Sequence, residues 1–336
     1  MLDLSIGAES DDDEEEVFLY NPGEICVDRD GSILVIDPLM PSITKFGKDG
    51  NLVWTIDSKG QGPEDIKTPT QIAVNRDGSI IVYDIGNRRF CFVTEDGQIL
   101  KTYDFSDWVW GLETAPDGTI WVETRLADFE GKRGGTLIKL LRYSSTFHTS
   151  VVVDSAIVKK NTYITKPVRT NVPVPFAPVV AWDIAPSGNI IIGRSSKYTV
   201  TILSPELELL TRVQHPGKHL EVTESDKETH FAGMAYNYGG AIEKGAPTFI
   251  RDNTEFPKYK PYFKQMHVDQ EGFILFQTYE TDIDGVIYDV FDPSGHFVNK
   301  LVLPELSGFR VITLGFVYQI ETPEDSPATI KRYKVN

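Results

Sequence analysis

The chain has 336 residues, 40% of them hydrophobic, and a formal net charge of −16. A chain of this length can bury about three quarters of its extended surface, so Cys26 and Cys91 are not needed as a disulfide and are expected to be buried thiols. The negative charge would repel nucleic acid, and no apolar run approaches the roughly 18 residues of a membrane span. Composition therefore predicts a folded protein that neither binds nucleic acid nor spans a membrane.

Two stretches near the start, residues 22–57 and 69–104, are copies of one unit. Ile25–Ile33 aligns with Ile72–Ile80, a displacement of 47 positions. Within a copy, short runs rich in β-branched residues alternate with Asp-Gly turns, as in a four-stranded antiparallel meander. Self-similarity at this period is typical of stacked units, and one such sheet per unit predicts a β-propeller blade.

Three weaker copies follow, Trp110–Val122, Trp182–Ile192 and Met266–Leu275, each with the turn glycine in the same place. A sixth copy over residues 308–335 lacks a fourth strand. We expect Leu2–Ile6 to supply it, which would pair the start of the chain with its end and leave no long unpaired edge. The predicted fold class is an all-β, six-bladed β-propeller of four-stranded antiparallel blades.

The six copies are expected to form a single domain over residues 1–336. Division of the chain by six gives roughly 56 residues per blade, within the usual size of a blade with its loops. The predicted blade units are residues 22–57, 69–105, 108–153, 179–213, 263–302 and 308–335, the last completed by residues 2–6.

Gly60–Ile66, followed by Pro69–Val74, Val82–Asp84, Asn87–Arg89 and Phe92, resembles an NHL repeat. The whole chain resembles bacterial six-bladed β-propeller proteins of the NHL/TolB-like type, many of which have no assigned function. Such relatives are commonly exported behind a signal peptide. The resemblance therefore implies a periplasmic or extracellular location, with the cytoplasm as the alternative, and the sequence is interpreted as a mature segment with a start methionine added.

Extra sequence is concentrated in the loops that join the second strand of a blade to its third, and in those that join the fourth strand to the next blade. Both kinds of loop open on the same end of the ring. These segments are residues 125–136, 154–178, 211–262 and 279–285. The largest contains a helix signal, with Thr223 as N-cap and the glycine pair at 239–240 as a stop. We expect a helical insertion near residues 223–245 to lie as a lid over the ring, on the face that repeat proteins often use for binding.

Eight residues are expected to reach the lidded mouth of the channel. Aromatic side chains beside cations suit a ligand that bears carboxylate or sugar groups, since flat faces stack and a guanidinium binds paired oxygens. Packing between blades is the alternative for the two tryptophans and for Tyr198. The candidate residues for ligand or partner binding are Gln71, Trp108, Trp110, Arg125, Arg194, Tyr198, Lys264 and Tyr279.

Six consecutive acidic residues, Asp11–Glu16, lie between the predicted closing strand and the first blade. One interpretation is a solvated loop. The other is a contact for a cation or a basic partner, although no spacing of ligands specifies it.

No catalytic motif is present, neither a nucleophile elbow, a Walker loop, a zincin helix nor a dinucleotide fingerprint. The six histidines share no position in the repeat. No catalytic residue, metal ligand or cofactor is predicted. The resemblance extends to propellers that are gluconolactonase-type hydrolases or peptide-amidating lyases, which leaves a calcium or zinc ion in the channel as an open alternative.

The sequence favours a non-enzymatic binding or scaffold propeller, expected to be monomeric, that recognises a protein or an extended polar ligand through its loop-rich face. A metal-dependent hydrolase or lyase with its ion in the central channel is the alternative. A purely structural assembly subunit is the third interpretation.

Overall fold

The computed structural model describes residues 2–7, 19–127, 135–165, 168–238, 241–283, 285–303, 310–313, 315–322 and 327–334. The acidic run Asp11–Glu16 and the glycine pair at 239–240 lie outside these ranges. Within them, no helix is both long and apolar enough to cross a membrane.

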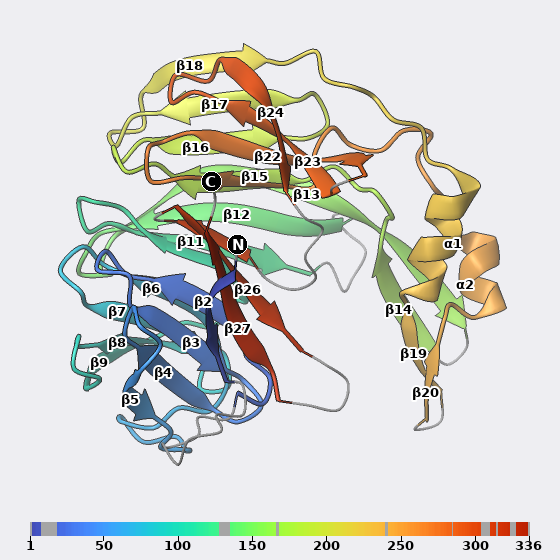
Figure 1. Ribbon diagram of the computed structural model, residues 1–336. Coiled ribbons are helices and arrows are strands. Elements are labelled where there is room, and N and C mark those ends of the chain that lie inside the picture. Colours follow the sequence, from blue (N-terminus) through green and yellow to red (C-terminus); the bar gives the residue numbers. More distant parts are fainter. Residues whose placement is uncertain are drawn as a thin grey trace.

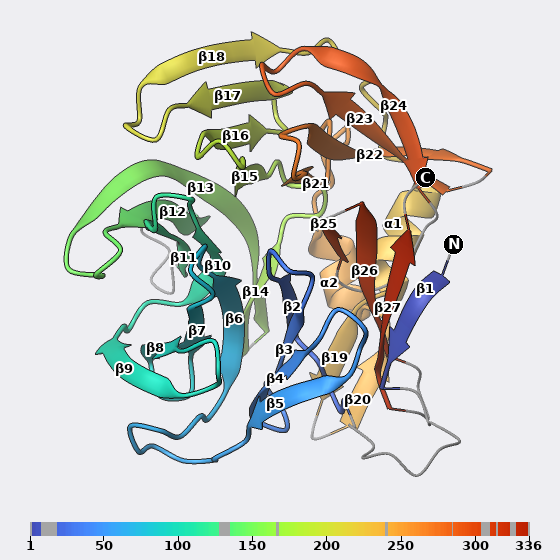
Figure 2. The same cartoon turned by 60° about the vertical axis from the view of Figure 1, so that its left-hand side comes forward.

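Six antiparallel sheets surround a central axis, with the first strand of each nearest that axis (Figure 2). The predicted six-bladed propeller is thereby confirmed. Blades 1 and 2 comprise β2 (Glu24–Val27), β3 (Ile33–Asp37), β4 (Ser42–Phe46), β5 (Leu52–Ile56), β6 (Pro69–Val74), β7 (Ile80–Asp84), β8 (Arg89–Val93) and β9 (Ile99–Asp104). Blades 3 and 4 comprise β10 (Val109–Thr114), β11 (Ile120–Leu126), β12 (Gly135–Tyr143), β13 (Ser150–Thr165), the additional β14 (Val168–Pro173), β15 (Val180–Ile184), β16 (Ile190–Arg194), β17 (Thr199–Leu203) and β18 (Leu209–Gln214). Blades 5 and 6 comprise β21 (Gln265–Val268), β22 (Ile274–Asp282), β23 (Gly285–Phe291), β24 (Phe297–Leu303), β25 (Arg310–Thr313), β26 (Phe316–Glu321), β27 (Thr329–Lys334) and β1 (Leu2–Ile6).

Ring closure follows the prediction. The first strand, β1, pairs antiparallel with the last, β27, in a register that places Ile6 opposite Ile330. The sheet of blade 6 therefore takes strands from both ends of the chain, and Figure 1 shows the two termini on the same side of the molecule.

The middle strands of the blades are buried on both faces because each blade lies between two neighbours. Every residue of β3, β7 and β8 is buried, whereas the outer strand β5 is largely exposed. This explains why the sequences of these middle strands are nearly continuous apolar runs and do not alternate between apolar and polar residues.

The turn between the first two strands accounts for the glycine of the repeat. In blade 1 the Asp28 amide donates to the Ser32 carbonyl, and the Asp28 carboxylate accepts from the amides of Asp30 and Ser32. Gly31 has a φ of 86°, a left-handed conformation that glycine adopts without steric cost. The corresponding glycines of blades 2 to 5 share it: Gly78, Gly118, Gly188 and Gly272.

A second element of the repeat, the aspartate that ends the second strand, holds the chain where it enters the blade. Asp37 accepts from the amides of Tyr20 and Asn21, at 3.1 and 2.7 Å. Asp84 does the same for Lys67 and Thr68, at 3.1 and 2.8 Å. Both aspartates are buried, so these bonds satisfy charged oxygens that water does not reach.

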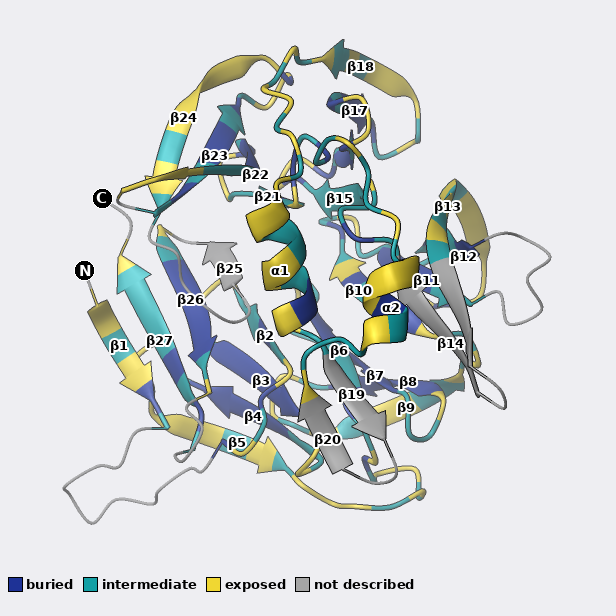
Figure 3. Ribbon diagram, turned by 90° about the vertical axis from the view of Figure 1, so that its right-hand side faces the viewer, coloured by how far each residue is buried: buried dark blue, intermediate teal, exposed yellow. Residues whose placement is uncertain are grey.

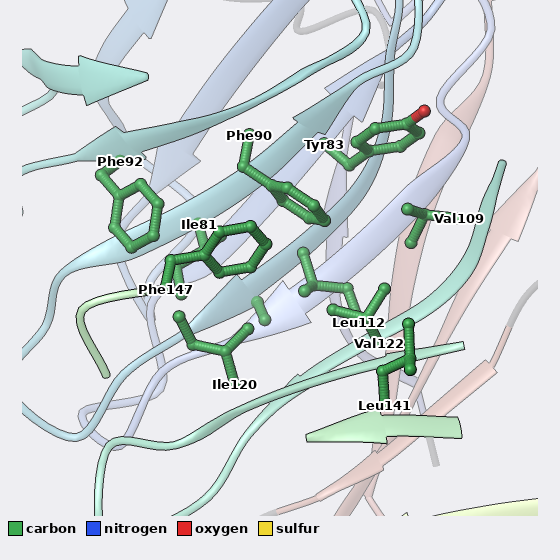
Figure 4. Close-up of a cluster of buried hydrophobic side chains, with 11 residues drawn as sticks. Ile81, Tyr83, Phe90, Phe92, Val109, Leu112, Ile120, Val122, Leu141 and Phe147 are labelled. Atoms are coloured by element: carbon green, nitrogen blue, oxygen red, sulfur yellow. The ribbon is translucent and has the colours of Figure 1, made fainter. Parts of the chain in front are cut away.

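Hydrophobic side chains fill the spaces between blades. Figure 4 shows the cluster between blades 2 and 3, where Phe90 and Phe147 pack with ring centroids 4.7 Å apart. Tyr143 stacks on Phe147 at 4.2 Å. The two cysteines are free thiols in the cluster between blades 1 and 2, where Cys91 is buried and Cys26 is half-buried.

The largest insertion folds as two helices and a hairpin. Helix α1 (Glu224–Ala232) begins at the predicted N-cap, where the Thr223 hydroxyl accepts from the Asp226 amide in a capping box. Strands β19 (Ala235–Tyr238) and β20 (Ala241–Lys244) follow, then α2 (Thr248–Asn253). Figure 1 places the helices to one side of the ring, and Figure 3 shows them in front of the inner strands, as expected for a lid.

Two details of the insertions differ from expectation. Helix α1 ends at Ala232 with Gly233 as its cap, so the predicted stop at the glycine pair is wrong. That pair lies between β19 and β20, and glycine pairs are also hairpin turn signals. Residues 154–178 are not all loop, because β13 continues to Thr165 and pairs with β14. The Val, Ile and Thr residues in this stretch favour a strand.

Candidate binding site in the central channel

A cavity of about 830 Å³ occupies the channel and is lined by the first strands of blades 1 to 5. It is large enough for a small ligand or for a side chain of a partner. Its lining runs along these strands from their starts, at Glu24 and Lys264, to the turns that follow them, at Arg29 and Gln270. The lid insertion, between β18 and β21, joins the ring at the end where the first strands begin.

Two positions recur in the first strands that line this cavity. They lie four and two residues before the residue that begins the turn: Asp28, Asn75, Ala115, Ala185 and Asp269. The residues between them, such as Ile25, Ile72 and Leu112, are buried between blades. Four residues before the turn, the cavity is lined by Glu24, Gln71, Gly111, Ala181 and Gln265. Two residues before the turn, it is lined by Cys26, Glu113, Asp183 and His267. The equivalent residue of blade 2, Ala73, is buried.

The channel carboxyls bridge neighbouring blades. Glu24 Oε2 accepts from the Ile72 amide of blade 2 at 2.8 Å. Asp183 Oδ2 accepts from the Val268 amide of blade 5 at 2.7 Å. In both cases the carboxyl bonds the amide one residue further along the adjacent strand, which is a direct consequence of the shared register.

The three carboxyls titrate above their ordinary range. Burial raises the pKa of Glu24 from 4.5 to about 8, although the Ile72 amide lowers it. Burial, followed by the charges of Asp183 and Glu24, raises the pKa of Glu113. Burial also raises the pKa of Asp183, against the lowering effect of two amides. The Glu113 side chain is exposed at the cavity wall, and neutral carboxyls here would offer O–H donors to a ligand.

Four residues of blades 3 and 4 form a connected group at the mouth of the channel, which we call the mouth cluster: Trp110, Glu123, Arg125 and Trp182. Glu123 Oε1 accepts from Arg125 Nε at 2.7 Å, and Glu123 Oε2 accepts from Trp182 Nε1 at 2.9 Å. The Arg125 guanidinium carbon lies 4.5 Å from the centroid of the Trp110 ring. Glu123 thus holds the guanidinium at its Nε edge, and the Trp110 ring packs against its face.

Local backbone features of β10 position this cluster. A bulge between Val109 and Gly111 interrupts the alternation of the strand, and Trp110 is 53% exposed there. A Cβ atom at Gly111 would lie 3.0 Å from Cζ2 of Trp182, so a side chain at this position would displace the indole. The glycine is required by the close approach of Trp182.

The eight candidate residues fall into separate environments. Gln71, Trp110, Arg125 and Lys264 line the cavity. Trp108 is 60% exposed next to β10 and does not line it.

The other three candidates lie away from the cavity. Arg194 forms an ion pair with Asp154. Tyr198 is buried between blades 4 and 5 with its hydroxyl donating to Asp289 at 2.6 Å, so a ligand in the channel does not reach it. Tyr279 lies under the lid, 5.8 Å from Phe176 between ring centroids.

Sequence reasoning missed several residues of the site. Glu123 and Trp182, which hold Arg125 in place, were not singled out, nor were the channel carboxyls. A comparison of the copies by distance from the turn would have found Glu113, Asp183 and His267 at one equivalent position of consecutive blades. Among the residues that the structure describes, no three His, Cys, Asp or Glu side chains form a group that could hold a metal ion.

Comparison with known proteins agrees with the fold. The profile of the family DUF5128, described as a 6-bladed beta-propeller, matches residues 13–134. No curated protein matches the sequence. A candidate exported protein from Bacteroides fragilis is 11% identical over 99% of this chain and 94% of its own, with a TM-score of 0.55. A member of the DUF4221 family from Bacteroides vulgatus is 10% identical over 99% of this chain and 96% of its own, with a TM-score of 0.57.

A gluconolactonase from Xanthomonas campestris is more distant. It is 12% identical over 94% of this chain and 86% of its own, with a TM-score of 0.46. At identities this low, the two Bacteroides proteins show the propeller fold alone.

Proposed function

We propose that the chain is a non-enzymatic binding propeller that recognises a protein or an extended polar ligand through its lidded face. The observation that carries this proposal is the cavity of about 830 Å³ with the mouth cluster at its opening. Exposed tryptophans beside a fixed guanidinium are typical of recognition surfaces, because they offer contact area at a low cost in conformational entropy.

The proposal includes a monomeric state and a periplasmic or extracellular location. The location is supported by the resemblance of the whole chain to exported propellers of the NHL/TolB-like type, and by the neighbour from Bacteroides fragilis that is described as exported. Neither feature affects the test of binding.

Binding by this face can be tested on glycan and peptide arrays with the wild type and a Trp108→Ala/Trp110→Ala double variant. We expect array signals for the wild type that the double variant loses. Arg142→Gln is the matched control, because Arg142 lies at the opposite end of blade 3, paired with Trp121 at the start of β11. Equal signals from the double variant and the wild type, or no signal from either, would contradict the proposal.

The second candidate is a metal-dependent hydrolase or lyase. The observation that favours it is that Glu113, Asp183 and His267 occupy equivalent channel positions on three consecutive blades, although they do not form a ligand group among the described residues. Elemental analysis by inductively coupled plasma mass spectrometry, with melting curves with and without a chelator, tests it. About one metal ion per chain and a lower melting temperature after chelation would support this candidate over the binding propeller.

A further inference from the structure

The mouth cluster contains an arginine whose hydrogen-bonding edge is left open. Arg125 uses Nε to bind Glu123, and neither of its Nη nitrogens has a hydrogen-bond partner among the described residues. Its side chain is 39% exposed at a wall of the cavity. The two Nη groups form a fork that matches the two oxygens of a carboxylate.

The fork is fixed before any ligand arrives. Glu123 has a side chain that is 8% exposed and uses both of its oxygens, one for Arg125 and one for Trp182. Trp110 supports the guanidinium face from the other direction. A side chain held in this way loses little further entropy when it binds, and this favours affinity.

Another arginine of blade 3 shows what a structural pair looks like in this chain. Arg142 also lies over a tryptophan, Trp121, with its guanidinium carbon 6.0 Å from the ring centroid. There the terminal nitrogen Nη2 of Arg142 forms an ion pair with Asp117 Oδ2 at 3.1 Å. Arg125 differs because its partner occupies Nε and leaves the terminal fork open.

Two other features suit an acid that carries a second polar group. The side-chain oxygen Oε1 of Gln71, another residue of the cavity wall, is buried without a hydrogen-bond donor among the described residues. It could accept from a hydroxyl or N–H group of the ligand. In the channel wall, the raised pKa of Glu24 and of Glu113 reduces the negative charge that a bound carboxylate would face.

We propose that Arg125 and Trp110 bind a ligand that carries both a carboxylate and a ring, with the carboxylate oxygens on the Arg125 fork and the ring beside the indole. This inference rests on the proposed binding function and names the chemistry of its ligand. The carboxylate could belong to an acidic sugar or to the C-terminus of a peptide with an aromatic residue. Both sources present the same two groups to the site.

Matched pairs of probes distinguish these sources. One pair is D-galacturonate and D-galactose, and the other is N-acetylphenylalanine and its amide. Binding is measured by tryptophan fluorescence and by saturation-transfer NMR. We expect one acid to bind the wild type at least tenfold more tightly than its neutral counterpart, because a hydrogen bond between charged partners is stronger than one between neutral partners. The pair that shows the difference identifies the source.

Variants assign the effect to the fork. Arg125→Gln should abolish the preference for the acid, and Arg125→Lys should retain only part of it, because an ammonium lacks the two-pronged geometry. Arg142→Gln should bind like the wild type. Thermal melts establish that the variants are folded.

Two results would overturn the inference: equal binding of acid and neutral probes by the wild type, or an unchanged preference in Arg125→Gln. The proposed binding function has a separate outcome. An array signal that is lost in the tryptophan double variant but kept in Arg125→Gln would retain that function and reject the carboxylate.

Discussion

Replacement of Glu24 by glutamine should stabilise the protein at alkaline pH and change little in acid. Burial in the channel wall raises the pKa of Glu24 from 4.5 to about 8. A folded-state pKa above the unfolded value means that the folded chain binds this proton more tightly. The stability from the protonated group is therefore complete below pH 4.5 and is lost as the pH rises to 8.

The size of the effect follows from that interval. A shift of about 3.5 pKa units corresponds to a ceiling of about 5 kcal/mol in the free energy of unfolding. Water in the cavity screens the half-buried carboxylate, so we expect on the order of 2 kcal/mol. An unfolding entropy of about 2 cal/mol/K per residue over the chain converts this to a rise in Tm of about 3 °C.

The assay is a set of thermal melts of wild type and Glu24→Gln between pH 5 and pH 9. Glutamine keeps an oxygen that can accept from the Ile72 amide, so the bond between blades is preserved. Glu206→Gln on an exposed turn is the control and should leave the pH profile unchanged. The reasoning is refuted if Glu24→Gln shifts Tm by the same amount at pH 5 and pH 9.

Three further predictions concern the ring itself. Tyr198→Phe removes the hydroxyl that donates to Asp289 and should lower the free energy of unfolding by about 1–3 kcal/mol in urea titrations; an unchanged midpoint would argue against that bond. Phe147→Ala should cost about 3–5 kcal/mol by the same titration, because it empties the centre of the cluster in Figure 4; a loss below about 1 kcal/mol would mean that the site collapses around the gap. Deletion of residues 2–6 should lower Tm and cause association that increases with concentration in light scattering, since it leaves β27 as an open edge; a monomer with unchanged Tm would show that β1 is dispensable.

The fold could be predicted because the blades repeat the same residues at their turns and strand ends. A glycine such as Gly31 marks the left-handed turn, and an aspartate such as Asp37 marks the end of the second strand. The closing strand Leu2–Ile6 was predictable because the last copy lacks one strand. These features depend on neighbours in sequence or on the count of strands.

The errors arose where local signals had two interpretations. The glycine pair at 239–240 was taken as a helix stop, but glycine pairs also mark hairpin turns, and β19 and β20 flank this one. Residues 154–165 were taken as loop, although their β-branched residues extend β13. Sequence alone does not decide between such alternatives, because contacts with distant residues decide them.

The site was only partly predictable for a related physical reason. Gln71, Trp110, Arg125 and Lys264 were placed at the channel by counting along the blade, and all four line the cavity. The exposed edge of Arg125 could not be predicted, because it depends on which nitrogen Glu123 occupies. That choice is set by the side-chain packing of two blades.

The channel acquires its chemical asymmetry where the copies differ. At the position two residues before the turn, blades 1 and 2 have Cys26 and Ala73, whereas blades 3 to 5 have Glu113, Asp183 and His267. At this position blades 3 to 5 therefore place carboxyl and imidazole groups around the channel, whereas blade 1 contributes its carboxyl, Glu24, two residues earlier. A symmetric ring would offer a ligand several equivalent orientations, but this distribution distinguishes them. Because Arg125 belongs to the same blade as Glu113, a ligand held at the mouth would meet these ionisable groups when it reaches into the channel.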